Sequence, residues 1–185
     1  MAIENLKNKY QRVLPDLKKE LGLTNSLAVP RLVKVVVSSG TGKAVDKKKK
    51  NELVADRLSK ITGQKPSPRP AKQSIASFKL RQGDIIGQSV TLRGNRMYAF
   101  LDKLINVAIP RSRDFKGYTL KSIDEMGNLT LAVKEHVVFP ETSDEDLKDV
   151  FGLAVTVITS ATDRQSGEVL FKHLDFPFKE TKKVA

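Results

Sequence analysis

Positively charged side chains are the residues of this sequence best suited to chemistry, and they are concentrated in one stretch without acids. No Asp or Glu occurs between Asp56 and Asp84. The run from Lys65 to Arg81 contains five Lys or Arg residues, three prolines and few large apolar side chains. Such a segment cannot bury a core of its own. We therefore predict a basic arm or long loop, at about residues 66–84, that binds an anionic partner.

Patterns typical of catalysis or metal binding are missing from the sequence. His136 and His173 each stand alone, without a second ligand at helical spacing, and are interpreted as structural or surface residues. The acids within residues 144–149 are interpreted as first-turn helix charges and not as a metal site. The absence of cysteine excludes disulfides, thiolate zinc sites and cysteine catalysis. We expect no enzymatic activity, no metal and no cofactor.

The segment from Gly40 to Ala44 resembles a phosphate-binding glycine loop but does not match the known sequence patterns of such loops. A P-loop needs G-x-x-x-x-G-K-[ST]; here Gly40 is too close to Gly42, and Ala44 stands where a hydroxyl is required. A dinucleotide-binding fingerprint fails as well, because no third glycine follows. Backbone amides of this loop, and the four lysines at 47–50, could contact RNA phosphates. For the lysines the alternative is a solvated, screened run.

The charge of the chain points to a polyanionic partner. The 185 residues carry a net charge of +12, and 39% of them are hydrophobic, which is enough for a core. Residues 1–120 hold 25 Lys+Arg and 9 Asp+Glu, a net of +16, whereas residues 121–185 hold 8 and 12, a net of −4. This imbalance favours nucleic acid or an anionic membrane surface. Because no apolar run could span a membrane and the N-terminus lacks a signal-peptide core, we expect a cytoplasmic protein.

Helices and strands are expected to alternate without a strict βαβ rhythm, which favours an α+β fold with a single domain over residues 1–185. Helices are predicted over 2–22, with a kink at Pro15 and a stop at Gly22, and over 47–62, with Asp46 as its cap. A third should run from Asn95 to Ile109 and end at Pro110. A short acidic helix near 143–149 is expected next, and a last helix should begin at Thr162 or Asp163 and end at about Leu174. Strands are predicted over 31–40, 89–93, 129–133 and 153–160.

One face of each predicted strand is apolar, and the other carries small residues, hydroxyls and a few cations. These second-face positions are Lys34, Val36, Ser38, Ser89, Thr91, Arg93, Thr130, Ala132 and Thr156. No aromatic ladder is present, so single-strand stacking is not indicated. Hydroxyls and cations suit the shallow minor groove of an RNA helix, although the same residues would also make an ordinary solvated sheet face. Periodicity does not separate these alternatives; the charge imbalance favours RNA.

Two other functions stay open at this level. One is an enzyme that acts on RNA or nucleotides through the glycine loop, although it lacks an acid–base pair or metal cluster. The other is a basic protein that binds membrane surfaces or other proteins. The first predicts turnover, and the second predicts interactions that survive ribonuclease.

Several blocks of the sequence closely resemble the bacterial large-subunit ribosomal protein five family, whose members bind 5S rRNA. These blocks are ITGQKP, the long run from Ala71 to Gly117, VKEHVVFPE, GLAVTVITSATD and the final FPF. The resemblance extends from about Leu6 to Phe178, and the block from Ile61 to Gly117 is its most specific part. It implies a curved, mostly antiparallel sheet covered on one face by helices. It also implies a structural role in the large ribosomal subunit, in the central protuberance.

The resemblance also implies a set of RNA-binding residues. The positions that match those used by the family for 5S rRNA are Ser38, Gln64 and Thr91, with Lys34, Lys65 and Arg93 close by. The family usually has Asn at the position of Ser38, so a shorter side chain must make that contact here. Large-subunit rRNA and other 5S-rRNA-binding ribosomal proteins are further expected partners.

In the family the basic arm reaches toward the P-site tRNA, and other loops touch a small-subunit head protein in an intersubunit bridge. The matching arm residues here are Arg69, Lys72, Ser74 and Lys79. Ser67-Pro68-Arg69-Pro70 replaces the family's usual, more flexible start of the arm, so its path is expected to differ. Candidate bridge residues are Arg111, Arg113, Asp144 and Asp146.

Overall fold

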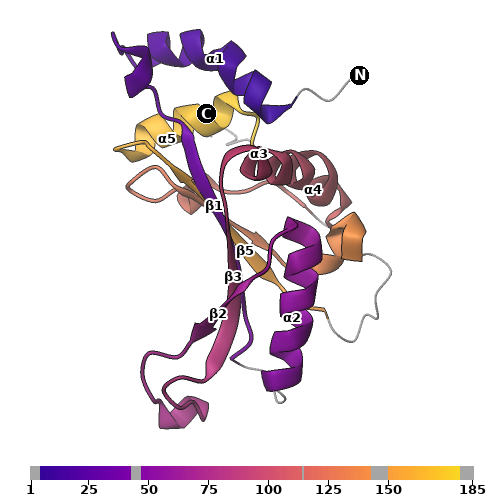
Figure 1. Ribbon diagram of the computed structural model, residues 1–185. Coiled ribbons are helices and arrows are strands. Elements are labelled where there is room, and N and C mark those ends of the chain that lie inside the picture. The colour runs from indigo at the N-terminus through magenta and orange to yellow at the C-terminus, as the bar shows by residue number, and fades with distance from the viewer. Residues whose placement is uncertain (1–4, 43–46, 114, 143–149, 180–185) are drawn as a thin grey trace, which may run out of the picture. The chain divides into compact units, whose positions relative to one another are not determined.

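The computed structural model describes residues 5–42, 47–113, 115–142 and 150–179 of the chain. In this part of the chain, five strands form one sheet in the order β2-β3-β1-β5-β4 (Figure 1). The strands are β1 (Leu32–Gly40), β2 (Ser67–Pro70), β3 (Ile85–Leu92), β4 (Leu129–Val133) and β5 (Leu153–Thr159). Short 3₁₀ turns lie at Ser26–Ala28, Ala76–Phe78, Leu120–Ser122, His136–Val138 and Pro140–Thr142.

Hydrogen bonds at the strand ends define the directions of the strands. The amide of Ser160 donates to the carbonyl of Arg31 at the start of β1, and the Ser39 hydroxyl donates to the carbonyl of Gly152 at its other end. Strands β1 and β5 are therefore antiparallel. Strands β2 and β3 are also antiparallel, with Ser67 opposite Ser89. The predicted α+β class with a mostly antiparallel sheet is confirmed.

The chain forms two compact units, each assembled from separate stretches of sequence. One comprises Met1–Val35, Arg93–Leu131 and Thr156–Ala185, and the other comprises Val36–Leu92 and Ala132–Val155. The boundaries fall inside strands β1, β4 and β5. We call them the first and the second unit. The prediction of a single domain over 1–185 stays a prediction.

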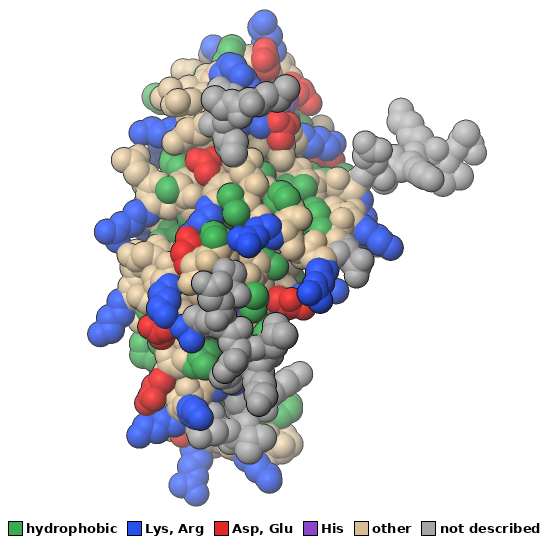
Figure 2. All heavy atoms as spheres, turned by 90° about the vertical axis from the view of Figure 1, so that its right-hand side faces the viewer, with side chains coloured by type: hydrophobic (Ala, Val, Ile, Leu, Met, Phe, Trp, Pro, Cys, Tyr) green, Lys and Arg blue, Asp and Glu red, His purple; other side chains and the backbone are tan. Residues whose placement is uncertain are grey.

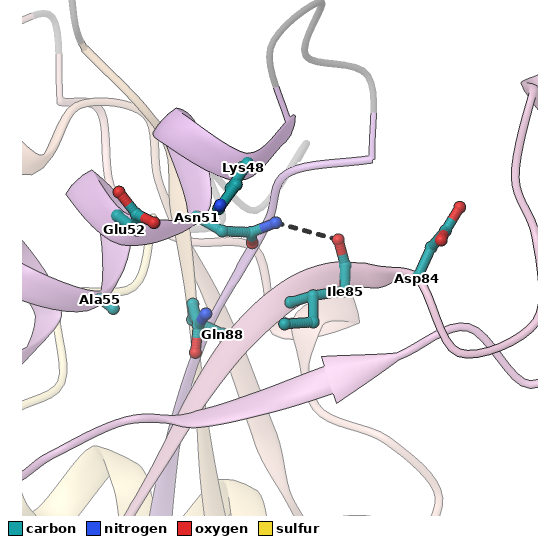
Figure 3. A pocket seen from close by; sticks show the side chains of 7 residues that line it. All are labelled: Lys48, Asn51, Glu52, Ala55, Asp84, Ile85 and Gln88. Carbon is teal, nitrogen blue, oxygen red and sulfur yellow. Dashed lines mark hydrogen bonds between the residues drawn. The ribbon is translucent and has the colours of Figure 1, made fainter.

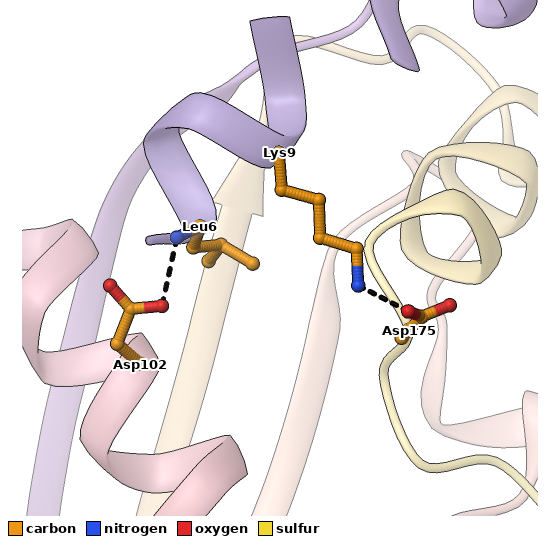
Figure 4. Close-up of polar contacts among 4 residues, drawn as sticks. All are labelled: Leu6, Lys9, Asp102 and Asp175. Carbon is orange, nitrogen blue, oxygen red and sulfur yellow. Dashed lines mark hydrogen bonds and ion pairs between the residues drawn. The ribbon is translucent and has the colours of Figure 1, made fainter. Parts of the chain in front are cut away.

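Helix α1 (Leu6–Glu20) of the first unit buries Leu6 and Leu17 and is also held by polar contacts. The Asp102 carboxylate accepts a 2.9 Å hydrogen bond from the Leu6 amide, and Lys9 forms an ion pair with Asp175 (Figure 4). The bond to Asp102 pairs one of the backbone amides that the start of every helix leaves without a partner inside the helix. The helix includes Pro15 and ends before Gly22, which has a φ of +63°, as predicted for a helix stop.

The predicted helix over 95–109 is longer than expected and changes its winding. Helix α3 (Gly94–Lys103) continues as a π-helical segment (Leu104–Ala108) and then as α4 (Ile109–Arg111). The prediction that Pro110 ends the helix is therefore wrong. A proline ring clashes with the carbonyl four residues earlier in regular α-helix. The wider π turn, in which the Ile109 amide donates to the Leu104 carbonyl, accommodates it.

Helix α5 (Arg164–His173) is capped by Asp163, one of the two predicted starts, whose side chain accepts a hydrogen bond from the Ser166 amide. In the second unit, helix α2 (Lys47–Thr62) has the predicted bounds and buries Val54, Leu58 and Ile61. It packs against β3. The predicted cap Asp46 and the predicted acidic helix at 143–149 lie outside the described residues. No helix among the described residues is long and apolar enough to cross a membrane.

Candidate nucleic-acid interface

The second unit brings together most of the residues expected to bind 5S rRNA. Ser38 on β1 and Thr91 on β3 are half-buried, while their neighbours Val37 and Leu92 are fully buried beneath them. This alternation places Ser38 and Thr91 on the face of their strands that the core leaves open. Their hydroxyls are therefore accessible to a ligand.

The turn after α2 is tied to this strand surface by Gln64. The Gln64 side-chain amide donates a 3.2 Å hydrogen bond to the backbone carbonyl of Thr91. The Thr62 hydroxyl donates to the Leu58 carbonyl at 2.6 Å and to the Gln64 carbonyl at 3.2 Å. Gly63, with a φ of +65°, allows the tight turn between them. Two predicted site residues, Gln64 and Thr91, are thus in direct contact.

Lys65 extends from the same turn and is exposed. Among the described residues it has no hydrogen-bond or ion-pair partner, so its charge is available to an external anion. The residues from Arg57 to Gly83 include no acid that could neutralise it. This turn is therefore a site of uncompensated positive charge.

Lys34 and Arg93 belong to the first unit. Lys34 is half-buried on β1, four residues before Ser38, and therefore lies on the same face of that strand. Arg93 is exposed just beyond the end of β3, two residues after Thr91, and it precedes α3 without capping it. The strand predicted over 89–93 thus begins earlier, at Ile85, and ends before Arg93.

The open face carries hydroxyls on β4 and β5, as predicted, but Ser89 is an exception. The hydroxyls of Thr130 and Thr156 lie 3.3 Å apart across the two strands. Ser89, which was expected on the open face, is only 5% exposed. The reason is the neighbouring strand β2, from which Arg69 donates a 3.0 Å hydrogen bond to the Ser89 hydroxyl. Ser89 is therefore unsuited to direct RNA contact.

The segment predicted as a basic arm or long loop is ordered by backbone hydrogen bonds. Its first part is strand β2, and the amide of Ala71 donates to the carbonyl of Asp84 at 2.8 Å. At its tip, the amide of Ile75 donates to the carbonyl of Leu80 at 3.1 Å. The Ser74 hydroxyl accepts a hydrogen bond from the Gln82 amide. Exposed arm residues include the predicted Arg69, Lys72, Ser74 and Lys79.

Sequence reasoning missed the apolar side chains at the tip of this arm. Phe78 is 66% exposed and Ile75 is 41% exposed, in a segment that is rich in basic residues and prolines. Their isolation from any helical or strand periodicity is the signal that could have identified them. They add apolar area next to the cations of the arm.

Among the predicted bridge residues, Arg111 ends α4 and is exposed, and Arg113 is exposed in the following segment. Asp144 and Asp146 lie outside the described residues. Figure 2 shows one face of the molecule, on which Lys and Arg side chains are spread among polar and apolar groups.

The two histidines and the glycine loop, which were considered above for catalysis or phosphate binding, make contacts within the protein. His136 is buried and stacks on Phe151 with ring centroids 4.2 Å apart, and His173 lies 2.7 Å from the Glu20 carboxylate. Thr41, in the glycine loop, donates its amide to the Ile86 carbonyl and its hydroxyl to Asn51. Lys43 and Ala44 are outside the described residues. No cluster of three potential metal ligands occurs in the parts of the chain that are described.

Comparison with known protein families accounts for most of the chain. Residues 25–81 match the family described as ribosomal protein L5, and residues 85–178 match the family that describes the C-terminus of this ribosomal protein. The large ribosomal subunit protein uL5 of Anaeromyxobacter sp. (strain K) is 46% identical over 176 residues, which are 95% of this chain and 98% of that protein. The uL5 protein of Prochlorococcus marinus (strain MIT 9211) is 47% identical over 178 residues, 96% of this chain and 99% of that protein.

These relatives align with nearly the whole length of the chain. They are structural constituents of the large ribosomal subunit, which confirms the prediction of a ribosomal protein that is not an enzyme. The chain belongs to the ribosomal protein L5 (uL5) family.

Proposed function

We propose that this chain binds 5S rRNA with the open side of β1 and β3 and with the turn that follows α2. Membership of the large ribosomal subunit makes rRNA and ribosomal proteins its partners. The hydrogen bond between Gln64 and Thr91 is the observation that carries this proposal. This hydrogen bond holds the turn after α2, which carries the unpaired Lys65, next to Thr91 on β3, whose hydroxyl faces outward. Cations then bind phosphates while short hydroxyls contact ribose 2′-hydroxyls in a shallow minor groove.

Lys34, Ser38 and Arg93 complete the proposed RNA-binding set. Each is exposed or half-buried, and none of them has an ion-pair partner among the described residues. Serine at position 38 donates or accepts one hydrogen bond over a short reach, so the RNA must approach β1 closely.

The arm between β2 and β3 has a separate proposed role, which is contact with the P-site tRNA. Lys72 and Lys79 are exposed near its tip, beside the apolar side chains Ile75 and Phe78. Cations with adjacent apolar surface suit a folded RNA that exposes both phosphates and base edges. Arg111 and Arg113 are proposed to take part in an intersubunit bridge to a small-subunit head protein, together with Asp144 and Asp146. Further proposed partners are the other 5S-rRNA-binding ribosomal proteins.

A salt titration of 5S rRNA binding tests the main proposal. We expect the triple variant Lys34→Ala, Lys65→Ala, Arg93→Ala to bind 5S rRNA more weakly than the unchanged protein. The slope of log K against log salt should fall by about 2 to 3, since each neutralised phosphate contributes about 0.7–0.9. The control is a triple alanine variant of Lys19, Lys121 and Lys134, which removes the same charge from exposed positions elsewhere.

Two results would contradict the proposal. One is an unchanged slope in the first triple variant, and the other is an equal loss in the control. Circular dichroism of each variant establishes that the fold is intact before binding is measured.

A further inference from the structure

A hollow of about 540 Å³ opens between α2 and β3 in the second unit, and the proposed RNA contacts do not involve it. Figure 3 shows its lining, with side chains of α2 facing those of β3 and of the residue before it. The lining residues are Lys48, Asn51, Glu52, Ala55, Asp84, Ile85 and Gln88. They belong to one compact unit.

Asn51 makes this hollow a rigid feature. Its side-chain nitrogen donates a 2.9 Å hydrogen bond to the Ile85 carbonyl, and its side-chain oxygen accepts a 2.6 Å hydrogen bond from Thr41. Asn51 is only 7% exposed, and both polar atoms of its side chain are engaged. The hydrogen bond from Asn51 to Ile85 therefore joins α2 to the start of β3 at one end of the lining.

Gln88 gives the first indication of a ligand. It is only 6% exposed, yet its side-chain amide has no hydrogen-bond partner among the described residues, and it lines the hollow. Gln88 is not among the residues whose side-chain polar atoms are both fully buried and unpaired in the described part of the chain, so its amide group opens into the hollow and is available to a group that enters. Its oxygen can accept a hydrogen bond, and its nitrogen can donate two, to a group that enters.

The charges at the rim give the second indication. Glu52 and Asp84 place two carboxylates around the hollow against one ammonium group, that of Lys48, in a chain with a net charge of +12. Glu52 has no ion-pair partner among the described residues. Asp84 accepts a hydrogen bond only from the Arg81 backbone amide within that part of the chain. Within the lining itself the two carboxylates outnumber the one ammonium group, which favours a cationic occupant.

We infer that this hollow binds an Arg or Lys side chain presented by an extended segment of a partner protein. The aliphatic stem packs against Ala55 and Ile85, which is 42% exposed, and the cationic head reaches Glu52. Gln88 accepts a hydrogen bond from the same head group or from the backbone of the segment. Arginine is the better occupant, because its planar guanidinium binds a carboxylate with two parallel hydrogen bonds.

The test is an NMR titration of the isotope-labelled full chain with the capped peptide Gly-Arg-Ile-Gly. Its neutral counterpart carries citrulline in place of arginine and has nearly the same shape. We expect the arginine peptide to shift the side-chain amide of Gln88 and the backbone amides of Ala55 and Ile85. The citrulline peptide should bind at least about fivefold more weakly, as expected for loss of one exposed charge pair.

Two variants locate the binding. Glu52→Gln should weaken binding of the arginine peptide by about fivefold, while Glu125→Gln, an exposed acid in the first unit, should leave it unchanged. Gln88→Leu should weaken both peptides, since it removes a hydrogen bond that does not depend on charge.

Three results would overturn the inference. The first is equal affinity for the arginine and citrulline peptides, and the second is a loss of arginine-peptide binding in Glu125→Gln as large as that in Glu52→Gln. The third is a shift of the Gln88 side-chain amide signal on addition of 5S rRNA but not on addition of the arginine peptide. The proposed 5S rRNA binding is measured separately, and Glu52→Gln should leave it intact because it removes a negative charge. Failure of one proposal is therefore distinguishable from failure of the other.

Discussion

The guanidinium of Arg69 donates a 3.0 Å hydrogen bond to the hydroxyl of Ser89, and so links strand β2 to strand β3 by their side chains. Strand β2 has few backbone bonds to offer, because Pro68 and Pro70 lack an amide hydrogen. It also lies at the edge of the sheet. The hydrogen bond between the side chains of Arg69 and Ser89 therefore contributes much of the pairing between β2 and β3.

We predict that Arg69→Ala loosens the pairing of β2 with β3. The protection of the Ser67 and Ala71 amides against hydrogen exchange should fall by an amount equivalent to about 1 kcal/mol, the usual net value of one hydrogen bond. Lys72→Ala is the matched control, since Lys72 is exposed and lies beyond the residues of β2 that pair with β3. Unchanged exchange in Arg69→Ala would show that the bond does not hold the arm.

A second prediction concerns the close approach of two glycines in the first unit. A Cβ added at Gly167 on α5 would lie 2.6 Å from the Cα of Gly127, which itself has a φ of +72°. Alanine at position 167 gains about 1 kcal/mol of helix propensity but must push two backbones apart, at a cost of about 1–3 kcal/mol or more. We expect Gly167→Ala to lower the free energy of unfolding in a urea titration.

Gly40→Ala serves as the control for this substitution. Nothing lies within 4 Å of a Cβ at Gly40, and its φ is not in the left-handed region. The control should change stability little. A Gly167→Ala variant as stable as the Gly40→Ala variant would mean that α5 shifts without cost.

The third prediction concerns pH. The backbone amide and the hydroxyl of Ser166 donate to the Asp163 carboxylate, at 3.0 and 2.8 Å, and lower the pKa of Asp163 below its usual value. A carboxylate with a lowered pKa in the folded state stabilises the fold above the pKa of the unfolded chain, about 3.9. That contribution is lost as the pH falls through the lower, folded-state pKa.

Asp163→Asn keeps a side-chain oxygen as acceptor but does not titrate. We expect the unchanged protein to exceed this variant in free energy of unfolding at about pH 6, and the difference to shrink as the pH falls below about 4. Urea titrations at several pH values measure it. A difference that is constant with pH would show that the charge of Asp163 does not contribute.

Regular periodicity made much of the fold predictable. Helix α2 and strand β4 have the predicted bounds, because each buries one face in a clear 3.6- or 2-residue pattern. Strand β2 was missed because its two prolines argue against a strand, although an edge strand tolerates them. The first half of β3, Ile85 to Gln88, was missed because two adjacent isoleucines followed by Gly87 and Gln88 do not alternate between apolar and polar residues.

The candidate site was less predictable than the fold. Charge and strand alternation indicated Lys34, Thr91 and Arg93, but the contact of Gln64 with Thr91 joins residues 27 positions apart in the chain. Only a resemblance to a known family could suggest it in advance. The burial of Ser89 depends on Arg69 from another strand, and the hollow at Gln88 depends on how α2 lies on β3. Such features arise from tertiary packing, which local patterns do not contain.

The segmented build of the two units has a consequence for how the protein emerges during its own synthesis. The first unit includes Thr156–Ala185 as well as the N-terminal helix, so it cannot be completed before that stretch has been translated. The second unit has all of its residues once Val155 has left the exit tunnel. Deleting helix α5 should therefore remove one of the elements that α1 packs against, while the second unit, which carries Gln64 and Lys65, retains every residue it is built from.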